Sequence, residues 1–271
     1  MASNSETGKR VFAKRSLGQN FLVDTGVVER IIREFAPQTD DIVVEIGPGR
    51  GALTEKLLGR VAAVYALEFD TRLTAALTER FAADASLTAI EGDALTFDFR
   101  QLVPEGQKLR LIANLPYNIS TAILQRLCEF DQLFSDCSLM FQREVADRIT
   151  AAPGTKDRGY LTLRTEANFD VVRLFDVPPE AFWPAPKVWS SVVRLTPTEN
   201  HIEDRPTFLD VIATGFSQKR KTILNNLKPR YAEAAASLEA AGIDPRRRAE
   251  TLLLEEWIRL ADIVRETQVN T

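Results

Sequence analysis

The chain has 271 residues, of which 45% are hydrophobic and 27% are charged. This balance is typical of a globular enzyme and excludes a disordered chain, and no apolar run approaches the roughly 20 residues of a membrane span. The net charge of -4 argues against a protein that is basic over its whole surface.

From residue 41 to about 195, short β-branched runs alternate with helical patterns. Strands are expected at 42–46, 63–69, 87–90, 109–113 and 138–142, and helices at 53–58, 71–81, 121–129 and 144–150. Such alternation predicts βαβ units in a parallel sheet with helices on both faces. Two later runs, 171–175 and 191–195, are expected to close the sheet as a hairpin across a proline-rich loop.

The pattern changes after Pro197. Residues 196–206 are polar and bounded by prolines, as in a linker, and only helical patterns follow, at 208–216, 220–227, 232–241 and 249–264. We therefore predict an N-terminal segment (1–40), an α/β domain (41–197) and a small all-helical domain (198–271).

Three successive strand ends carry glycines or acids. The first ends in the turn Glu45-Ile46-Gly47-Pro48-Gly49-Arg50-Gly51, the second in Glu68, and the third in Asp93. Ligands of open parallel sheets bind at these ends, where an acid can accept hydrogen bonds from ribose hydroxyls or an adenine amine. The pattern predicts a nucleoside-containing cofactor, and the glycine turn alone also suits a nicotinamide dinucleotide.

The fourth strand ends in Asn114-Leu115-Pro116-Tyr117-Asn118-Ile119-Ser120. An asparagine carbonyl and a main-chain carbonyl can accept the two hydrogens of an adenine amine, which exposes its lone pair, while a tyrosine can stack on the extruded base. With S-adenosylmethionine as donor, alignment and proximity supply most of the catalysis and no general base is required.

The chain resembles the small-subunit ribosomal RNA adenine dimethyltransferases, the KsgA/RsmA family, over nearly its whole length. The resemblance rests on the motifs at 16–22, 45–49, 114–120, 142–145, 177–182, 186–188, 191–195 and 220–223. It implies a Rossmann-like class I methyltransferase sheet with a small C-terminal all-helical domain. The chain departs from the family's usual pattern at Tyr160, Trp183 and Trp189.

The resemblance also implies a set of roles. S-adenosylmethionine would contact Asn20, Leu22, Gly47, Glu68, Asp93 and Asn114, and the target adenine would lie between Tyr117 and Phe182, beside Leu115 and Pro116. Two methyl groups would be added to each of two adjacent adenosines near the 3′ end of the RNA. We expect a cytoplasmic monomer that acts on the assembling small ribosomal subunit without a membrane.

Basic residues are clustered in the sequence despite the net negative charge. Lys9, Arg10, Lys14 and Arg15 lie near the N-terminus, and two further clusters lie in the helical region: Lys219, Arg220 and Lys221, and Arg246, Arg247 and Arg248. The two later clusters are expected to contact RNA phosphates. A solvated helix face is the alternative, although cations are unfavourable at the start of a helix, where Arg246–Arg248 are expected.

Other functions fit parts of the sequence. A large-subunit RNA methylase that confers macrolide resistance is similar through the catalytic region, a DNA adenine methylase more usually carries Asp-Pro-Pro-Tyr, and a non-catalytic assembly factor could share the fold. Cys128 and Cys137 form no disulfide framework, and the single histidine, His201, lies in the polar linker. We expect no metal site and no chemistry that depends on histidine.

Overall fold

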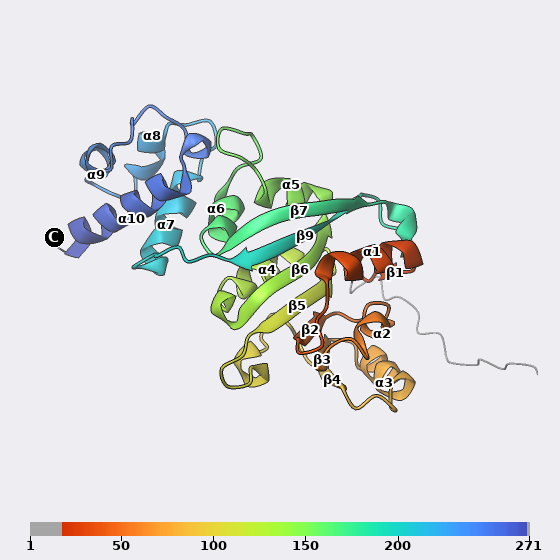
Figure 1. Ribbon diagram of the computed structural model, residues 1–271. Coiled ribbons are helices and arrows are strands. Elements are labelled where there is room, and N and C mark those ends of the chain that lie inside the picture. Colours follow the sequence, from red (N-terminus) through yellow and green to blue (C-terminus); the bar gives the residue numbers. More distant parts are fainter. Residues whose placement is uncertain (1–17, 270–271) are drawn as a thin grey trace, which may run out of the picture.

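The computed structural model describes residues 18–269 (Figure 1). A seven-stranded sheet has the order β4-β3-β2-β5-β6-β9-β7, in which β9 runs antiparallel to both of its neighbours and the other six strands run in one direction. The strands are β2 (Ile42–Ile46), β3 (Ala63–Glu68), β4 (Leu87–Glu91), β5 (Leu109–Asn114), β6 (Phe134–Gln142), β7 (Phe169–Val177) and β9 (Ser190–Pro197). The predicted α/β class and the late hairpin are confirmed.

Ten α-helices and two very short strands complete the elements within residues 18–269. The helices are α1 (Thr25–Phe35), α2 (Thr54–Leu57), α3 (Thr71–Arg80), α4 (Ser120–Leu127), α5 (Arg143–Ile149), α6 (Tyr160–Glu166), α7 (Arg205–Gly215), α8 (Ile223–Leu227), α9 (Ala234–Ala240) and α10 (Leu254–Val269). Strands β1 (Phe21–Leu22) and β8 (Phe182–Trp183) pair with each other, and 3-10 turns lie at Phe99–Leu102, Asp131–Leu133, Pro179–Ala181 and Ala249–Thr251.

The sheet separates two apolar clusters, which explains why its central strands are apolar on both sides. In β2, Val44 and Ile46 join the cluster that contains α4, whereas Val43 joins the cluster that contains α1. Successive side chains of a strand point to opposite faces, so a strand covered on both sides is nearly all apolar. Glu45 is the one polar residue of this strand and is buried.

Helix α1 was not predicted, although its signals are present. Asp24 caps its start by accepting a hydrogen bond from the Val27 amide at 3.0 Å, and its buried residues recur at helical spacing. Arg110 of β5 fastens the end of this helix to the sheet. Its guanidinium lies 4.0 Å from the Phe35 ring centroid and donates to the carboxylates of Asp41 and Asp136 at 2.6 and 2.7 Å.

The C-terminal helices form a third cluster around Trp257, which is fully buried. Figure 1 shows α7–α10 grouped beyond one end of the β7–β9 hairpin, away from α1–α3. The cluster also includes Leu163 and Ala167, which belong to or follow α6 and precede the predicted boundary at 197. The three-part division of the chain stays a prediction.

The two predicted helix starts that bear on the basic clusters are wrong. The helix expected at 220–227 begins only at Ile223, because Thr222 adopts extended geometry and its hydroxyl caps the helix by accepting from the Asn225 amide at 3.4 Å. The helix expected from 249 begins at Leu254, after the 3-10 turn. Arg246–Arg248 therefore do not start an α-helix, and Arg248 instead directly precedes the 3-10 turn.

Among residues 18–269, no helix is long and apolar enough to cross a membrane. The basic residues Lys9, Arg10, Lys14 and Arg15, and the first two residues of the 16–22 motif, lie outside the described part of the chain.

Candidate active site

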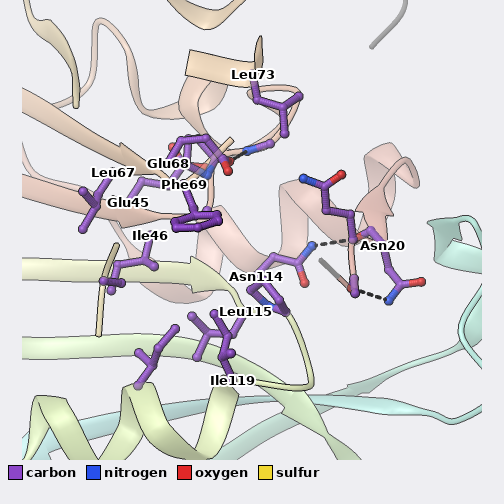
Figure 2. A pocket seen from close by; sticks show the side chains of 18 of the residues that line it. Asn20, Glu45, Ile46, Leu67, Glu68, Phe69, Leu73, Asn114, Leu115 and Ile119 are labelled. Atoms are coloured by element: carbon purple, nitrogen blue, oxygen red, sulfur yellow. Dashed lines mark hydrogen bonds between the residues drawn. The ribbon is translucent and has the colours of Figure 1, made fainter. Parts of the chain in front are cut away.

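A cavity lies at the carboxyl ends of β2, β3, β4 and β5 (Figure 2). The segment before α1 also contributes to the cavity, because Gly18–Leu22 line it together with the strand ends. The lining consists of segments 18–22, 45–50, 67–69, 92–95 and 114–119, with Ala52, Leu53, Leu73 and Ile123. All six residues predicted to contact the cofactor belong to this lining.

The glycine turn after β2 has a backbone that other residues adopt poorly. Gly47 and Gly49 have φ angles of 66° and 57°, in the left-handed region. The turn is fixed by the Gly47 amide, which donates to the Leu67 carbonyl of β3 at 2.9 Å. A Cβ on Gly49 would lie 3.1 Å from the Phe21 ring, so glycine also allows the 18–22 segment to approach the turn.

Glu68 is held rigidly where β3 ends. It is 7% exposed, and its two carboxylate oxygens accept the Gly49 amide at 3.1 Å and the Asp70 amide at 3.0 Å. Burial raises the pKa of this carboxyl above its usual value, against the lowering effect of these hydrogen bonds. Each carboxylate oxygen can accept a second hydrogen bond, so capacity for ribose hydroxyls remains.

Asp93 has a similar arrangement at the end of β4. Its Oδ1 accepts the Leu95 amide at 2.9 Å, which fixes the side chain while Oδ2 retains acceptor capacity. Both acids thus combine a main-chain anchor with a further acceptor on the cavity. The donor set of a nucleoside, with its hydroxyls and amine, fits these two acceptors.

Glu45 is a third acid at this end of the sheet, and its environment is different. It is buried and accepts the Thr54 hydroxyl at 2.6 Å. Desolvation, with a smaller contribution from the nearby charge of Glu68, raises its pKa to about 7. It is therefore partly protonated at neutral pH.

The turn after β5 places an amide and an aromatic ring on the same cavity. The Asn114 side-chain amide donates to the Asn20 carbonyl at 3.2 Å, so the side chain is anchored through its nitrogen and its oxygen keeps its acceptor capacity. Figure 2 shows this bond and the convergence of Glu68 and Asn114 on the cavity. Tyr117 is positioned by a 2.6 Å hydrogen bond between its hydroxyl and that of Ser190 in β9.

A family model for the ribosomal RNA adenine dimethylases matches residues 11–266, almost the entire chain. The chain belongs to the ribosomal RNA adenine dimethylase family. This confirms the family that the sequence motifs indicated, and with it adenine dimethylation in ribosomal RNA as the family's reaction.

Individual relatives agree with this assignment. The "Ribosomal RNA small subunit methyltransferase A" of Chromohalobacter salexigens is 45% identical over 262 residues, which cover 94% of this chain and 92% of the relative. The crystal structure of a dimethyladenosine transferase from Plasmodium falciparum has a TM-score of 0.77 at 28% identity and covers 89% of this chain and 95% of that one. The 23S rRNA methyltransferase ErmE has a TM-score of 0.69 at 25% identity and covers 91% and 100%. The class I methyltransferase fold of the dimethylase is thereby confirmed.

The predicted catalytic residues of the dimethylase divide into two groups. Asn114, Leu115, Pro116 and Tyr117 line the cavity together. Phe182 does not line it: the ring is 3% exposed and packs in the apolar cluster around α1, and its strand β8 pairs with Leu22. A base held between Tyr117 and Phe182 therefore stays a prediction.

Three further lining residues were not predicted from the sequence. Phe69 lines the cavity although it is 60% exposed, Arg50 places its guanidinium 4.6 Å from the Phe21 ring centroid, and Asn118 lies close to the backbone at Gly18. Phe69 and Asn118 directly follow the predicted site residues Glu68 and Tyr117, and Arg50 belongs to the predicted glycine turn, so proximity in the sequence was the available signal. The role of Phe21 depends on tertiary packing that the sequence does not display.

The predicted RNA-binding cluster at 219–221 lies in the turn before α8. All three side chains are exposed, and with Gln218 they line a surface hollow. The Lys219 ammonium donates to the carbonyl of Lys156, in the loop between α5 and α6. The Asn226 side chain stabilises the turn by donating to the Gly215 and Gln218 carbonyls.

The arginines at 246–248 have different environments. Arg246 pairs with Asp244 at 2.9 Å and remains 88% exposed, and Arg248 is exposed. Arg247 donates with two nitrogens to the Glu256 carboxylate in the first turn of α10. Arg247 thus fastens the 246–248 segment to α10, which its position in a run of arginines does not indicate.

Proposed function

We propose that the dimethylase transfers methyl groups from S-adenosylmethionine to the exocyclic amines of two adjacent adenosines near the 3′ end of small-subunit ribosomal RNA, two to each. The observation that carries the proposal is the side chain of Asn114. It is anchored by its nitrogen to Asn20, and its oxygen keeps acceptor capacity in a cavity that the strand-end acids share.

The cofactor would be held by residues that already have fixed positions. Glu68 would accept the ribose hydroxyls and Asp93 the adenine amine, since both keep acceptor capacity beyond their main-chain hydrogen bonds. Gly47 leaves room for close approach at the turn, and Asn20 and Leu22 line the cavity from the segment before α1. When bound, S-adenosylmethionine supplies an electrophilic methyl group on a sulfonium.

The target base would be prepared by the turn after β5. The Asn114 side-chain oxygen and a main-chain carbonyl of the Leu115–Pro116 turn would accept the two amine hydrogens and so expose the nitrogen lone pair. Tyr117 would stack on the base that has left its RNA strand. Burial raises the pKa of the Tyr117 phenol, so this ring stays neutral at physiological pH.

Ribosomal RNA would also be held outside the cavity. The exposed turn at Lys219–Lys221, with Arg246 and Arg248, would contact phosphates. A monomer acting on the assembling subunit fits this arrangement, because a single chain carries the cavity and the basic turn. The name of the Chromohalobacter salexigens relative, which specifies the small subunit, supports this choice of RNA.

The test compares substrates with labelled cofactor. Immature small subunits, mature small subunits, free small-subunit RNA and large-subunit RNA are each incubated with the wild-type protein and with Asn114→Ala. We expect wild-type incorporation into small-subunit RNA, with immature subunits preferred, and little incorporation by the variant. Preferential labelling of large-subunit RNA would favour an activity like that of the 23S rRNA methyltransferase ErmE and contradict the proposal.

A further inference from the structure

Two of the three tryptophans of the dimethylase are exposed beside the cavity. Trp183 and Trp189 are 44% and 48% exposed, and Val188 between them is 43% exposed, whereas Trp257 is fully buried in the helical cluster. Tryptophans usually bury most of their surface, and exposed apolar patches mark interaction sites. The two indoles therefore indicate a surface with a partner.

Both tryptophans neighbour residues that position the lining of the cavity. Trp183 pairs across β8 and β1 with Phe21, which lines the cavity, and the Arg50 guanidinium lies 5.1 Å from its ring centroid. Trp189 is attached to the side of the cavity that Tyr117 forms, because the next residue is Ser190, the hydrogen-bond partner of the Tyr117 hydroxyl. In Figure 1 the loop that joins β7 to β9 lies next to β1.

The segment that carries the indoles has a restricted backbone. Pro184 and Pro186 fix their φ angles, and the Arg143 amide donates to the Trp189 carbonyl at 2.9 Å. The exposed side chain of Lys187 lies between the tryptophans in the chain, and Arg143 is exposed next to Trp189. Exposed rings on a restricted backbone beside cations suit a single-stranded nucleic acid, which offers both bases and phosphates.

We propose that Trp183 and Trp189 stack on unpaired RNA bases that neighbour the target adenosine. The inference rests on the proposed function, because a target adenosine that enters the cavity brings the adjacent nucleotides of its strand past Trp183 and Trp189. Stacking tolerates any base, so the two indoles add affinity and hold the strand in place without reading its sequence.

The test uses the intrinsic fluorescence of the full-length protein and a single-stranded RNA of about eight nucleotides with two central adenosines, within the usual site size for such binding. Quenching is expected on titration, since two of the three indoles are exposed. Trp183→Ala combined with Trp189→Ala should weaken RNA binding at least about 25-fold, roughly 5-fold or more for each stacked base, measured with a labelled oligonucleotide. Trp183→Phe with Trp189→Phe should keep most of the affinity, because phenylalanine can also stack on a base. Affinity for S-adenosylmethionine should stay unchanged in both variants.

Val172→Ala is the matched control, because Val172 is a large apolar residue on β7 that is 56% exposed. Wild-type affinity in the double alanine variant, or no quenching of the wild-type protein, would overturn the inference. Normal oligonucleotide binding with weaker binding to assembled subunits would assign the surface to a ribosomal protein and overturn it equally. Label incorporation by the wild type is measured in parallel: its absence would instead refute the proposed function.

Discussion

The cavity at the strand ends and the basic turn before α8 differ in how far the chain itself fixes their side chains. In the cavity, Glu68, Asp93 and Asn114 each have a main-chain partner that orients them before any ligand arrives. The side chains of Lys219–Lys221 are exposed to solvent, and Lys219 among them donates to the main-chain carbonyl of Lys156. We therefore expect the chemistry to depend on side chains that the fold has already oriented, and the electrostatic part of RNA affinity to depend on exposed charges.

The largest effect on activity is expected from a substitution in the cavity. Asn114→Ala removes the acceptor for the target amine and should lower turnover roughly 100-fold to 1,000-fold, the scale for one oriented hydrogen-bonding group in an active site. Single-turnover methylation of immature small subunits measures it. A variant that methylates at the wild-type rate would show that Asn114 does not orient the amine.

Glu68→Gln tests the cofactor side of the same cavity. Replacing an ionised acceptor by a neutral one should weaken S-adenosylmethionine binding by about 1.5–3 kcal/mol, measured by calorimetry. Glutamine is preferable to alanine here, because Glu68 is buried and accepts two main-chain amides: glutamine keeps one acceptor oxygen for them, whereas alanine would leave both unpaired. Thermal unfolding of Glu68→Gln is the control, and unchanged affinity would remove Glu68 from the site.

Glu45 makes the free energy of unfolding depend on pH. Because its folded pKa is raised from 4.5 to about 7, the folded state binds more protons than the unfolded state between these values. Its contribution to stability is therefore present at low pH and declines as pH rises from about 4.5 to about 7, by about 1 kcal/mol per pH unit within that window. Urea unfolding should show that Glu45→Gln lacks this decline, and parallel curves for the two proteins would contradict the assignment.

The smallest effect is expected from substitutions in the basic turn before α8. Neutralising Lys219, Arg220 and Lys221 together should flatten the salt dependence of subunit binding by roughly 0.7–0.9 in log–log slope for each phosphate that these side chains neutralise in the wild-type complex. S-adenosylmethionine affinity should not change, because the cavity lies on other elements. An unchanged slope with full methylation would mean that the turn is only a solvated surface.

The sequence predicted the strand-end side of the molecule well, because each strand there is an apolar run that ends in a glycine, an acid or an amide. It missed β1 and β8, since each is only two residues long and Phe21 pairs with Trp183 across most of the chain. It also missed α6, a seven-residue helix that begins directly after Gly159, whose apolar pattern is too short to distinguish from a strand.

The charged residues were the least predictable part. Arg247 and its neighbours are equivalent in the sequence, and only the fold shows that Arg247 binds Glu256 while Arg246 and Arg248 are exposed. Thr222 likewise caps α8, so the helix begins after the Lys219–Lys221 cluster and the cluster lies in a turn instead of on a helix face. Pairing of this kind depends on which elements meet in space, and composition does not encode it.

The most direct test of the central claim is the identity of the product. Small-subunit RNA is incubated with the dimethylase and labelled S-adenosylmethionine, digested to nucleosides and to oligonucleotides, and analysed by mass spectrometry. We predict label in N6,N6-dimethyladenosine at two adjacent positions near the 3′ end of the RNA. Label in another nucleoside, or at positions that are not adjacent, would contradict a cavity built to present the adenine amine to the methyl donor.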